Sequence, residues 1–484
     1  MAAKSLRKNF LMNTFLSMSS FLFPLITFPY ISRILMASGL GKINFATSIV
    51  NYLLTFAMLG MPLYGVKVCA SHLKDRRKLI QTVSELLLIN MLVGVVALII
   101  LALLTIFIGK FRENWELIAI FSCLIPLNII GMEWLYKALE EYSYIAVRTM
   151  IFKVLGIVLM FAFVHERTDY LIYAAITVFA GSASYILNFI KALPYLNVRK
   201  NEALNLKQHV RPLLSFFLLT VSWTIYTNTD VIMLGFLSTD SQVGYYSASL
   251  RIKSIVLSIV GSLSTVILPR VVHYFAEERY EEAKLILRKS SSFIWLSSLY
   301  FIGFIIISAE GIITLLSGDG YLLATPTLQA TIVTVLFVGL SAFLGTNILV
   351  SLGKESVTIR ASFVGILINI LLNLLLIPRL ASLGAGIATV VGEASMVLYE
   401  LLYLGKESHE YFDERNIAKI LLVFTATFLI TTFIYPSLSV LPIFFRLLVS
   451  GGLYSLIYGI GLYLVKENLV VDWVSGLLKR FKNS

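Results

Sequence analysis

The chain has 484 residues, of which 58% are hydrophobic and only 14% are charged, and its mean hydropathy is +0.87. A soluble domain is about 25% charged, and roughly half of its surface must still face water, so these values exclude a water-soluble enzyme. The net charge of +12 must be placed relative to a membrane before it can indicate a partner, and nucleic acid is not expected.

Apolar runs long enough to cross a bilayer recur along the whole chain. A bilayer core about 30 Å thick requires about 20 residues per helix. The runs are continuous rather than alternating, so they predict helices and not barrel strands. We expect fourteen membrane spans, at residues 10–34, 44–66, 84–108, 117–138, 149–165, 170–190, 213–237, 244–268, 290–316, 325–352, 357–377, 385–404, 417–435 and 444–465.

The basic residues predict the orientation of these spans. Most of the 39 Lys and Arg residues fall in the connectors on the side of the two termini. The opposite connectors hold only Arg33, Lys42, Lys110, Arg112, Arg167 and Arg379. Since positive charge gathers in cytoplasmic loops, both termini are expected to be cytoplasmic. The first run follows basic residues but lacks an A-x-A cleavage site, so it is expected to remain as a span.

The connector at 191–211 divides the spans into a first six and a second eight. We predict an N-terminal six-helix lobe at 1–191, a cytoplasmic linker at 192–211 and a C-terminal six-helix lobe at 212–404. Two additional spans at 405–465 and a basic cytoplasmic tail at 466–484 follow. The expected class is an all-α polytopic membrane protein, with two lobes around a central cavity, as in transporters built from repeats.

The sequence contains no recognisable catalytic motif. Two cysteines and five histidines form no disulfide framework or metal cluster, so no metal and no cofactor are expected. The chain contains no G-x-x-x-x-G-K-[ST] loop, and no connector is large enough for a catalytic domain. We therefore predict no catalytic residue and no enzyme activity.

Charged side chains inside predicted spans are costly and normally face a cavity or a partner. Asp230 precedes the outer end of the seventh span by about seven residues, and Arg251 follows the outer start of the eighth by the same number. At 1.5 Å per residue, both lie about 10 Å below the outer surface. Two interpretations stay open: a structural ion pair, or a cavity lined by Arg251 and Lys253 with a titratable acid beside them.

Further polar residues mark other spans. Glu393 in the twelfth span and Asn369 in the eleventh lie at matching depth, and Asn373 lies one turn from Asn369. They are interpreted either as interhelical hydrogen-bonding groups or as cavity lining. Arg33 closes the first span, where snorkelling alone would also explain it. Glu400 and Arg360, near the inner face, are interpreted as a surface pair.

Short motifs resemble the Wzx-type polysaccharide flippases of the multidrug/oligosaccharidyl-lipid/polysaccharide exporter superfamily. Their order and spacing cover nearly the whole chain, although Met36-Ala37-Ser38 replaces the usual Gly-Pro-acidic turn. The matching segments are FPYISRIL at 28–35, Gly39-Leu40-Gly41, Asn44-Phe45-Ala46, 60–65, Asn228-Thr229-Asp230-Val231, Gly244-Tyr245-Tyr246, 373–378 and 384–389.

The resemblance implies a flippase that moves undecaprenyl-diphosphate-linked oligosaccharides from the inner to the outer leaflet of the cytoplasmic membrane by alternating access. It implies that cavity cations hold the anionic substrate. The matching positions are Arg33 and Arg251, with Lys253 as a local addition. The expected polar lining is Asn228, Asn369 and Asn373, and Asp230 or Glu393 would couple transport to H⁺ or Na⁺.

Two alternatives remain beside this expectation. A drug/cation antiporter of the same superfamily would need an acidic, aromatic cavity, whereas the eighth span carries surplus cations. A membrane glycan polymerase or ligase would display a large outer loop. The expected partners are the lipid-linked oligosaccharide, membrane lipids, and the polymerase and glycosyltransferases of the same pathway. The sugar composition leaves no linear motif.

Overall fold

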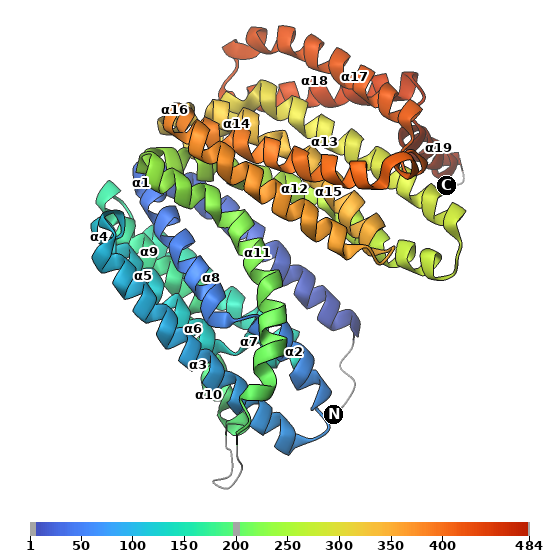
Figure 1. Ribbon diagram of the computed structural model, residues 1–484. Coiled ribbons are helices and arrows are strands. Elements are labelled where there is room, and N and C mark those ends of the chain that lie inside the picture. Colours follow the sequence, from blue (N-terminus) through green and yellow to red (C-terminus); the bar gives the residue numbers. More distant parts are fainter. Residues whose placement is uncertain (1–5, 197–203, 483–484) are drawn as a thin grey trace. The chain divides into compact units, whose positions relative to one another are not determined.

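The computed structural model describes residues 6–196 and 204–482, and every regular element within these ranges is a helix (Figure 1). The all-α architecture predicted from the continuous apolar runs is thus observed in the described residues. The chain forms two compact units, residues 1–244 and 245–484. Part of the predicted linker at 192–211 and the extreme end of the basic tail lie outside the described residues.

The first unit is built around its first long helix. This helix, α1, packs against α3, α8 and α11, because its apolar residues are distributed over most of its circumference. The helices of the unit are α1 (Leu6–Met58), α2 (Met61–Ser71), α3 (Arg76–Phe107), α4 (Gly109–Glu113), α5 (Trp115–Ser122), α6 (Leu124–Gly131), α7 (Glu133–Ala138), α8 (Tyr142–Phe163), η1 (Arg167–Asp169), α9 (Tyr170–Val178), η2 (Phe179–Ala183), α10 (Tyr185–Ala192), η3 (Leu193–Tyr195) and α11 (Lys207–Leu237).

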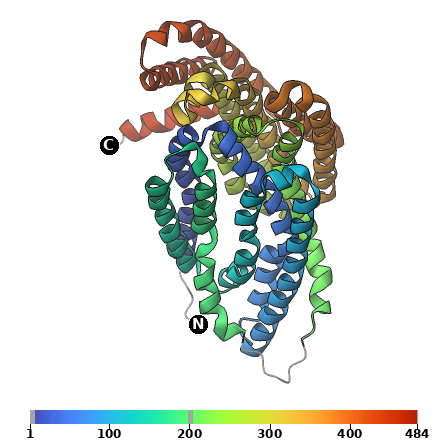
Figure 2. The ribbon, with the colours of Figure 1, turned by 90° about the vertical axis from the view of Figure 1, so that its left-hand side faces the viewer.

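The second unit is centred on α13, which contacts α14, α15, α17 and α18. The last two of these helices lie side by side in both views (Figure 1, Figure 2). Its helices are α12 (Asp240–Ala276), whose first turn belongs to the first unit, α13 (Tyr280–Ser317), η4 (Asp319–Ala324), α14 (Thr325–Ile332), α15 (Thr334–Ser341), η5 (Ala342–Val350), α16 (Glu355–Leu404), η6 (Gly405–Glu410), α17 (Glu414–Ile434), η7 (Tyr435–Val440), α18 (Ile443–Leu464) and α19 (Asn468–Lys482).

Two of the longest helices are broken where the sequence predicts a boundary between spans. Met36 interrupts α1 with φ 58° and ψ 178°, and Ala381 interrupts α16 with φ 48° and ψ −125°. Among the described residues, ten helical segments are long and apolar enough to cross a membrane, and two of them contain these breaks. Helices α11 and α12 occupy the ranges of the predicted seventh and eighth spans. The count of fourteen stays a prediction.

The compact units do not divide where the predicted lobes divide. Helix α11 follows the predicted linker, yet it belongs to the first unit because it packs along α1. Hydroxyl contacts join the two helices: the Tyr52 hydroxyl lies 2.6 Å from that of Thr229, and the Thr55 hydroxyl lies 2.9 Å from that of Thr224. The six-helix lobes at 1–191 and 212–404 therefore stay a prediction.

Two glycines allow the backbones of α1 and of the first turn of α12 to touch. A Cβ atom on Gly41 would lie 1.7 Å from the carbonyl oxygen of Asp240, and one on Gly244 would lie 2.0 Å from that of Ala37. The Nζ atom of Lys110 also contacts Oδ1 of Asp240 at 2.8 Å. Only glycine permits this approach, because it has no side chain to displace the neighbouring backbone.

Candidate functional site

The predicted site residues of the first unit lie on α1 and α11. Arg33 is exposed, three residues before the break in α1, and its Nη1 atom donates to the carbonyl oxygen of Pro29 at 2.6 Å. Asp230 on α11 is 6% exposed. The Asn228 side-chain amide donates to the carbonyl oxygen of Thr224 at 3.1 Å. The hydroxyl contacts between α1 and α11 hold this part of α11 in place.

The predicted cations of the second unit lie on α12. Arg251 is half-buried, whereas Lys253 is only 9% exposed. The Tyr246 hydroxyl contacts that of Thr389 at 3.0 Å, which fastens α12 to α16. Since residues seven positions apart share a helix face, Lys253 lies on the face of α12 that carries Tyr246. Lys253 is therefore a buried lysine on the face of α12 from which Tyr246 contacts α16.

The predicted polar residues of α16 lie along the contact between its two halves, before and after the break at Ala381. The Asn373 side-chain amide donates to Oδ1 of Asn369 at 3.1 Å. A Cβ atom on Gly392 would lie 3.0 Å from the Cβ atom of Asn369, so the residue beside Glu393 packs directly on Asn369. Glu393 is 3% exposed, and its Oε1 atom has no hydrogen-bond partner among the described residues. The structure thus brings Asn369 and Glu393 to one level of the second unit, with Asn373 one helical turn away.

Other predicted neighbours fall in different compact units. Asp230 belongs to the first unit and Arg251 to the second, so their pairing stays a prediction. The same holds for a cavity shared by Arg33, Arg251 and Lys253. What each unit shows by itself is a set of charged or amide groups inside long apolar helices, which is typical of transport proteins.

A buried cluster that the sequence did not reveal joins α2, α3 and α11. Glu85 is 1% exposed and His209 is 3% exposed; Oε2 of the glutamate lies 2.8 Å from Nε2 of the histidine. The Tyr64 hydroxyl contacts Nδ1 of His209 at 2.8 Å. The backbone amide of Asn205 donates to Oε1 of Glu85 at 2.7 Å, and the Gln208 side chain donates to Oε2 at 2.9 Å.

This cluster fastens the start of α11 to the first unit. The glutamate and the histidine are 124 residues apart, so no local pattern connects them. The only sequence signal is a carboxylate just inside the predicted third span, since a buried carboxylate normally has partners.

Replacing Glu85 by alanine is expected to lower the free energy of unfolding by about 1–3 kcal/mol, because it leaves the buried Nε2 atom of His209 without its hydrogen-bond partner. The amides of Asn205 and Gln208 also lose their acceptor. The unfolding temperature of the detergent-solubilised protein measures the effect. Glu116→Ala, which removes an exposed carboxylate of the same unit, is the control. Equal unfolding temperatures for the two variants would contradict a fastening role for Glu85.

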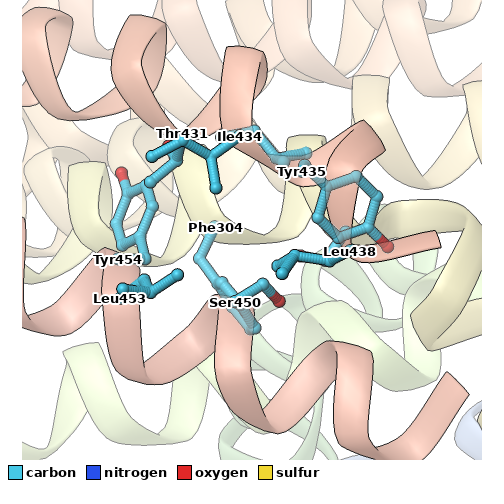
Figure 3. Close-up of a pocket in the computed structure, with 10 residues that line it drawn as sticks. Phe304, Thr431, Ile434, Tyr435, Leu438, Ser450, Leu453 and Tyr454 are labelled. Atoms are coloured by element: carbon cyan, nitrogen blue, oxygen red, sulfur yellow. The ribbon is translucent and has the colours of Figure 1, made fainter. Parts of the chain in front are cut away.

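A separate small pocket lies among α13, α17, η7 and α18. Figure 3 shows Tyr435 and Tyr454 at opposite sides of it, and the hydroxyls of both, like that of Ser308, are buried without a partner among the described residues. No cation predicted to bind substrate is among the residues that line it: Phe304, Ile307, Ser308, Thr431, Ile434, Tyr435, Leu438, Ser450, Leu453 and Tyr454. This pocket is not the predicted substrate site.

Comparison with solved structures shows the fold of membrane transporters. The lipid II flippase MurJ matches with a TM-score of 0.66 and 17% identity, over 93% of this chain and 99% of that chain. An inward-facing multidrug resistance MATE family transporter matches with a TM-score of 0.59 and 14% identity, over 78% and 93%. The described part of the chain thus has the helical, polytopic fold of these membrane proteins, as the sequence predicts.

Sequence comparison shows the family. The family model described as polysaccharide biosynthesis protein matches residues 6–275, and the MatE model matches residues 212–375. Since the first match exceeds half of the chain, the chain belongs to the polysaccharide biosynthesis protein family. A protein of Escherichia coli (strain K12) named "Putative O-antigen transporter" is 22% identical over 406 residues, which cover 83% of this chain and 97% of the relative.

A shorter match comes from an archaeon. The protein named "Probable low-salt glycan biosynthesis flippase Agl15" of Haloferax volcanii is 23% identical over 180 residues, which cover 37% of this chain and 38% of the relative. The predicted resemblance to polysaccharide flippases is therefore confirmed at the level of the family.

Proposed function

We propose that the protein is a flippase for undecaprenyl-diphosphate-linked oligosaccharides, which it moves from the inner to the outer leaflet for surface polysaccharide biosynthesis. The observation that carries the proposal is the pair of cations on α12, Arg251 and Lys253, within a helix that belongs to a transporter of the polysaccharide biosynthesis family. The names of relatives as O-antigen transporters and as a glycan flippase support it.

The chemistry of this substrate explains the need for such residues. A diphosphate and its attached sugars do not cross hydrocarbon unaided, because each polar group without a partner costs several kcal/mol. Guanidinium and ammonium groups of Arg33, Arg251 and Lys253 would replace water around the diphosphate. Side-chain amides of Asn228, Asn369 and Asn373 would bind sugar hydroxyls. The prenyl tail would remain in the lipid.

Transport by alternating access would follow from rocking of one lobe against the other. Asp230 or Glu393 would couple this movement to H⁺ or Na⁺. The protein would reside in the cytoplasmic membrane with both termini in the cytoplasm, since basic residues gather in the connectors on the side of the termini. It would act beside the glycosyltransferases and the polymerase of the same pathway.

Reconstitution in proteoliposomes tests the proposal. Fluorescently labelled undecaprenyl-diphosphate-linked oligosaccharide is quenched from outside, and the protected fraction is followed with time. The protein is expected to equilibrate the label between leaflets, and the triple variant R33Q/R251Q/K253Q is expected to lose this activity. Arg415→Gln, an exposed cation of α17, is the control.

The match to the MatE family model favours a second candidate function, drug/cation antiport, which the same vesicles can test. An antiporter would export an organic cation such as ethidium from loaded vesicles and would leave the lipid-linked sugar in place. Ethidium efflux without redistribution of the labelled lipid would overturn the proposed substrate.

A further inference from the structure

A line of polar side chains runs through the second unit, between the second half of α16 and the segment from α14 to η5. The hydroxyls of Thr327 and Ser382, 55 residues apart, lie 2.9 Å from one another. Gly386 and Thr331 are also 55 residues apart, and a Cβ atom on Gly386 would lie 3.2 Å from Cγ2 of Thr331. The two segments therefore run parallel and in register.

The line of polar side chains ends at Glu400. This residue lies beside Gly345, which is again 55 residues earlier in the chain, so the two segments are still in register. A Cβ atom on Gly345 would lie 2.7 Å from Oε1 of Glu400 and 3.3 Å from Oγ1 of Thr358. The carboxyl and the hydroxyl thus meet at a backbone position that only glycine leaves open. Gly345 belongs to η5, a π-helix, and π-helical turns are frequent at functional sites.

Glu400 is completely buried, which corrects its interpretation as half of a surface pair. Its supposed partner, Arg360, is exposed and donates from Nε to the carbonyl oxygen of Ser356 at 3.2 Å. Neither carboxylate oxygen of Glu400 has a donor at good hydrogen-bond geometry among the described residues, although the Ser341 hydroxyl lies beside it. Sequence could not reveal this, because the face on which the residue lies depends on the packing of α16.

Glu393 lies on the same face of α16 as Glu400. Seven residues separate the two carboxyls, which is two helical turns, or about 10 Å. By the register of the two segments, Ser341 is level with residue 396, between the two glutamates. Ser341 is 9% exposed, so it lies inside the packed helices, as the two glutamates do.

Charged groups near the two carboxyls are few on every element that packs against α16. The segment from α14 to η5 contains no titratable residue. Lys253 stands on the face of α12 that carries Tyr246, which contacts α16. The remaining charged groups of α16 and η6 are exposed: Glu355, Arg360, Arg379, Lys406, Glu407, His409 and Glu410. Glu393 and Glu400 thus lie in a largely apolar environment. A carboxyl in such an environment is suited to carry a proton, because the bound proton makes the group neutral.

We propose that Glu400 and Glu393 are successive stations of a proton route through the second unit, with the Ser341 hydroxyl as the relay between them. A proton from the side of Thr358 binds the Glu400 carboxylate. Glu400 then gives it to the Ser341 oxygen, which releases its own proton to the Glu393 carboxylate. Glu400 is left anionic and is reloaded. The inference deepens the proposed flippase function, on which its coupling role rests, by assigning the proton as the coupling ion.

Infrared difference spectroscopy of the purified, reconstituted protein tests the stations without any cargo. The carbonyl-stretch band of protonated carboxyls is recorded while pH is varied in sodium-free buffer. Glu393→Gln and Glu400→Gln are each expected to remove a separate part of this band, whereas Glu355→Gln, an exposed glutamate of the same helix, leaves it unchanged. Intact bands in both buried-site variants would overturn the proposal, as would bands that vanish when sodium is added.

Proton-driven flipping tests the route. The stimulation by a pH gradient is expected at about tenfold, within the usual range of coupling between two sites, and Glu393→Gln should abolish it. Ser341→Ala should retain both infrared bands but slow the stimulated rate, which a merely structural serine would not do. Unaltered stimulation in Ser341→Ala would overturn the relay. If flipping is absent even in the unaltered protein while the bands titrate, the proposed cargo is wrong and the proton stations stand.

Discussion

Arg251→Ala is expected to lower transport of the lipid-linked oligosaccharide by about 100-fold, while Arg251→Lys retains part of it. Hydrogen bonds to charged groups contribute about 1.5–3 kcal/mol each, and 1.4 kcal/mol corresponds to a factor of ten. Alanine removes both charge and hydrogen bonds, whereas lysine keeps the charge but not the guanidinium fork. The measurement is surface polysaccharide in cells that depend on this protein, with its level followed by immunoblotting.

Arg270→Ala is the matched control, because Arg270 is an exposed cation further along α12. Normal polymer in cells with Arg251→Ala would remove Arg251 from substrate binding. A second comparison separates the two interpretations of Asp230. Recovery of transport in the double variant D230N/R251Q, after loss in each single variant, would assign the two residues to a structural pair rather than to the cavity.

Gly41→Ala is expected to prevent accumulation of folded protein. A methyl group at this position would lie 1.7 Å from the carbonyl oxygen of Asp240, and a backbone atom has no alternative rotamer. Overpacking in a well-packed interior typically costs about 1–3 kcal/mol, and displacement of backbone adds to it. The fraction of monodisperse protein after solubilisation, together with its unfolding temperature, measures the loss.

Gly181→Ala serves as the control for this glycine, since a Cβ atom there would meet nothing within 4 Å. Wild-type yield and unfolding temperature for Gly41→Ala would show that α1 and the first turn of α12 do not need their close approach. Gly41 lies just before the predicted second span and Gly244 begins the predicted eighth, so the contact joins the starts of these two spans.

Hydropathy and span length predicted much of the fold. Lipid imposes a simple condition, because every backbone polar group must be satisfied within its own helix, and continuous apolar runs therefore predict helices. The expected turns of the first and eleventh spans coincide with the breaks at Met36 and Ala381. The predicted family was confirmed because short motifs in a fixed order are specific together, although each single motif is too apolar to be specific.

The site was predicted less completely. Depth along a helix follows from counting residues, so the sequence alone places Asn369 and Glu393 at one level. The direction in which a side chain points depends on how neighbouring helices pack. The prediction that Glu400 lies at the surface was therefore wrong, since the residue is fully buried. The partners of Glu85 lie far along the chain, at Asn205, Gln208 and His209, and no periodicity reports such a contact.

The sequence by itself indicated that the protein lies in a lipid bilayer, that it is helical and which family it belongs to. It also predicted the depth of the charged residues within the membrane. These properties depend on composition, on the order of short motifs and on distance along single helices. Only the tertiary structure decided which charges are buried, which carboxyls lack partners and where glycine lets backbones touch. Those properties depend on side chains that come together from distant segments, and their energies arise at the contact rather than along the chain.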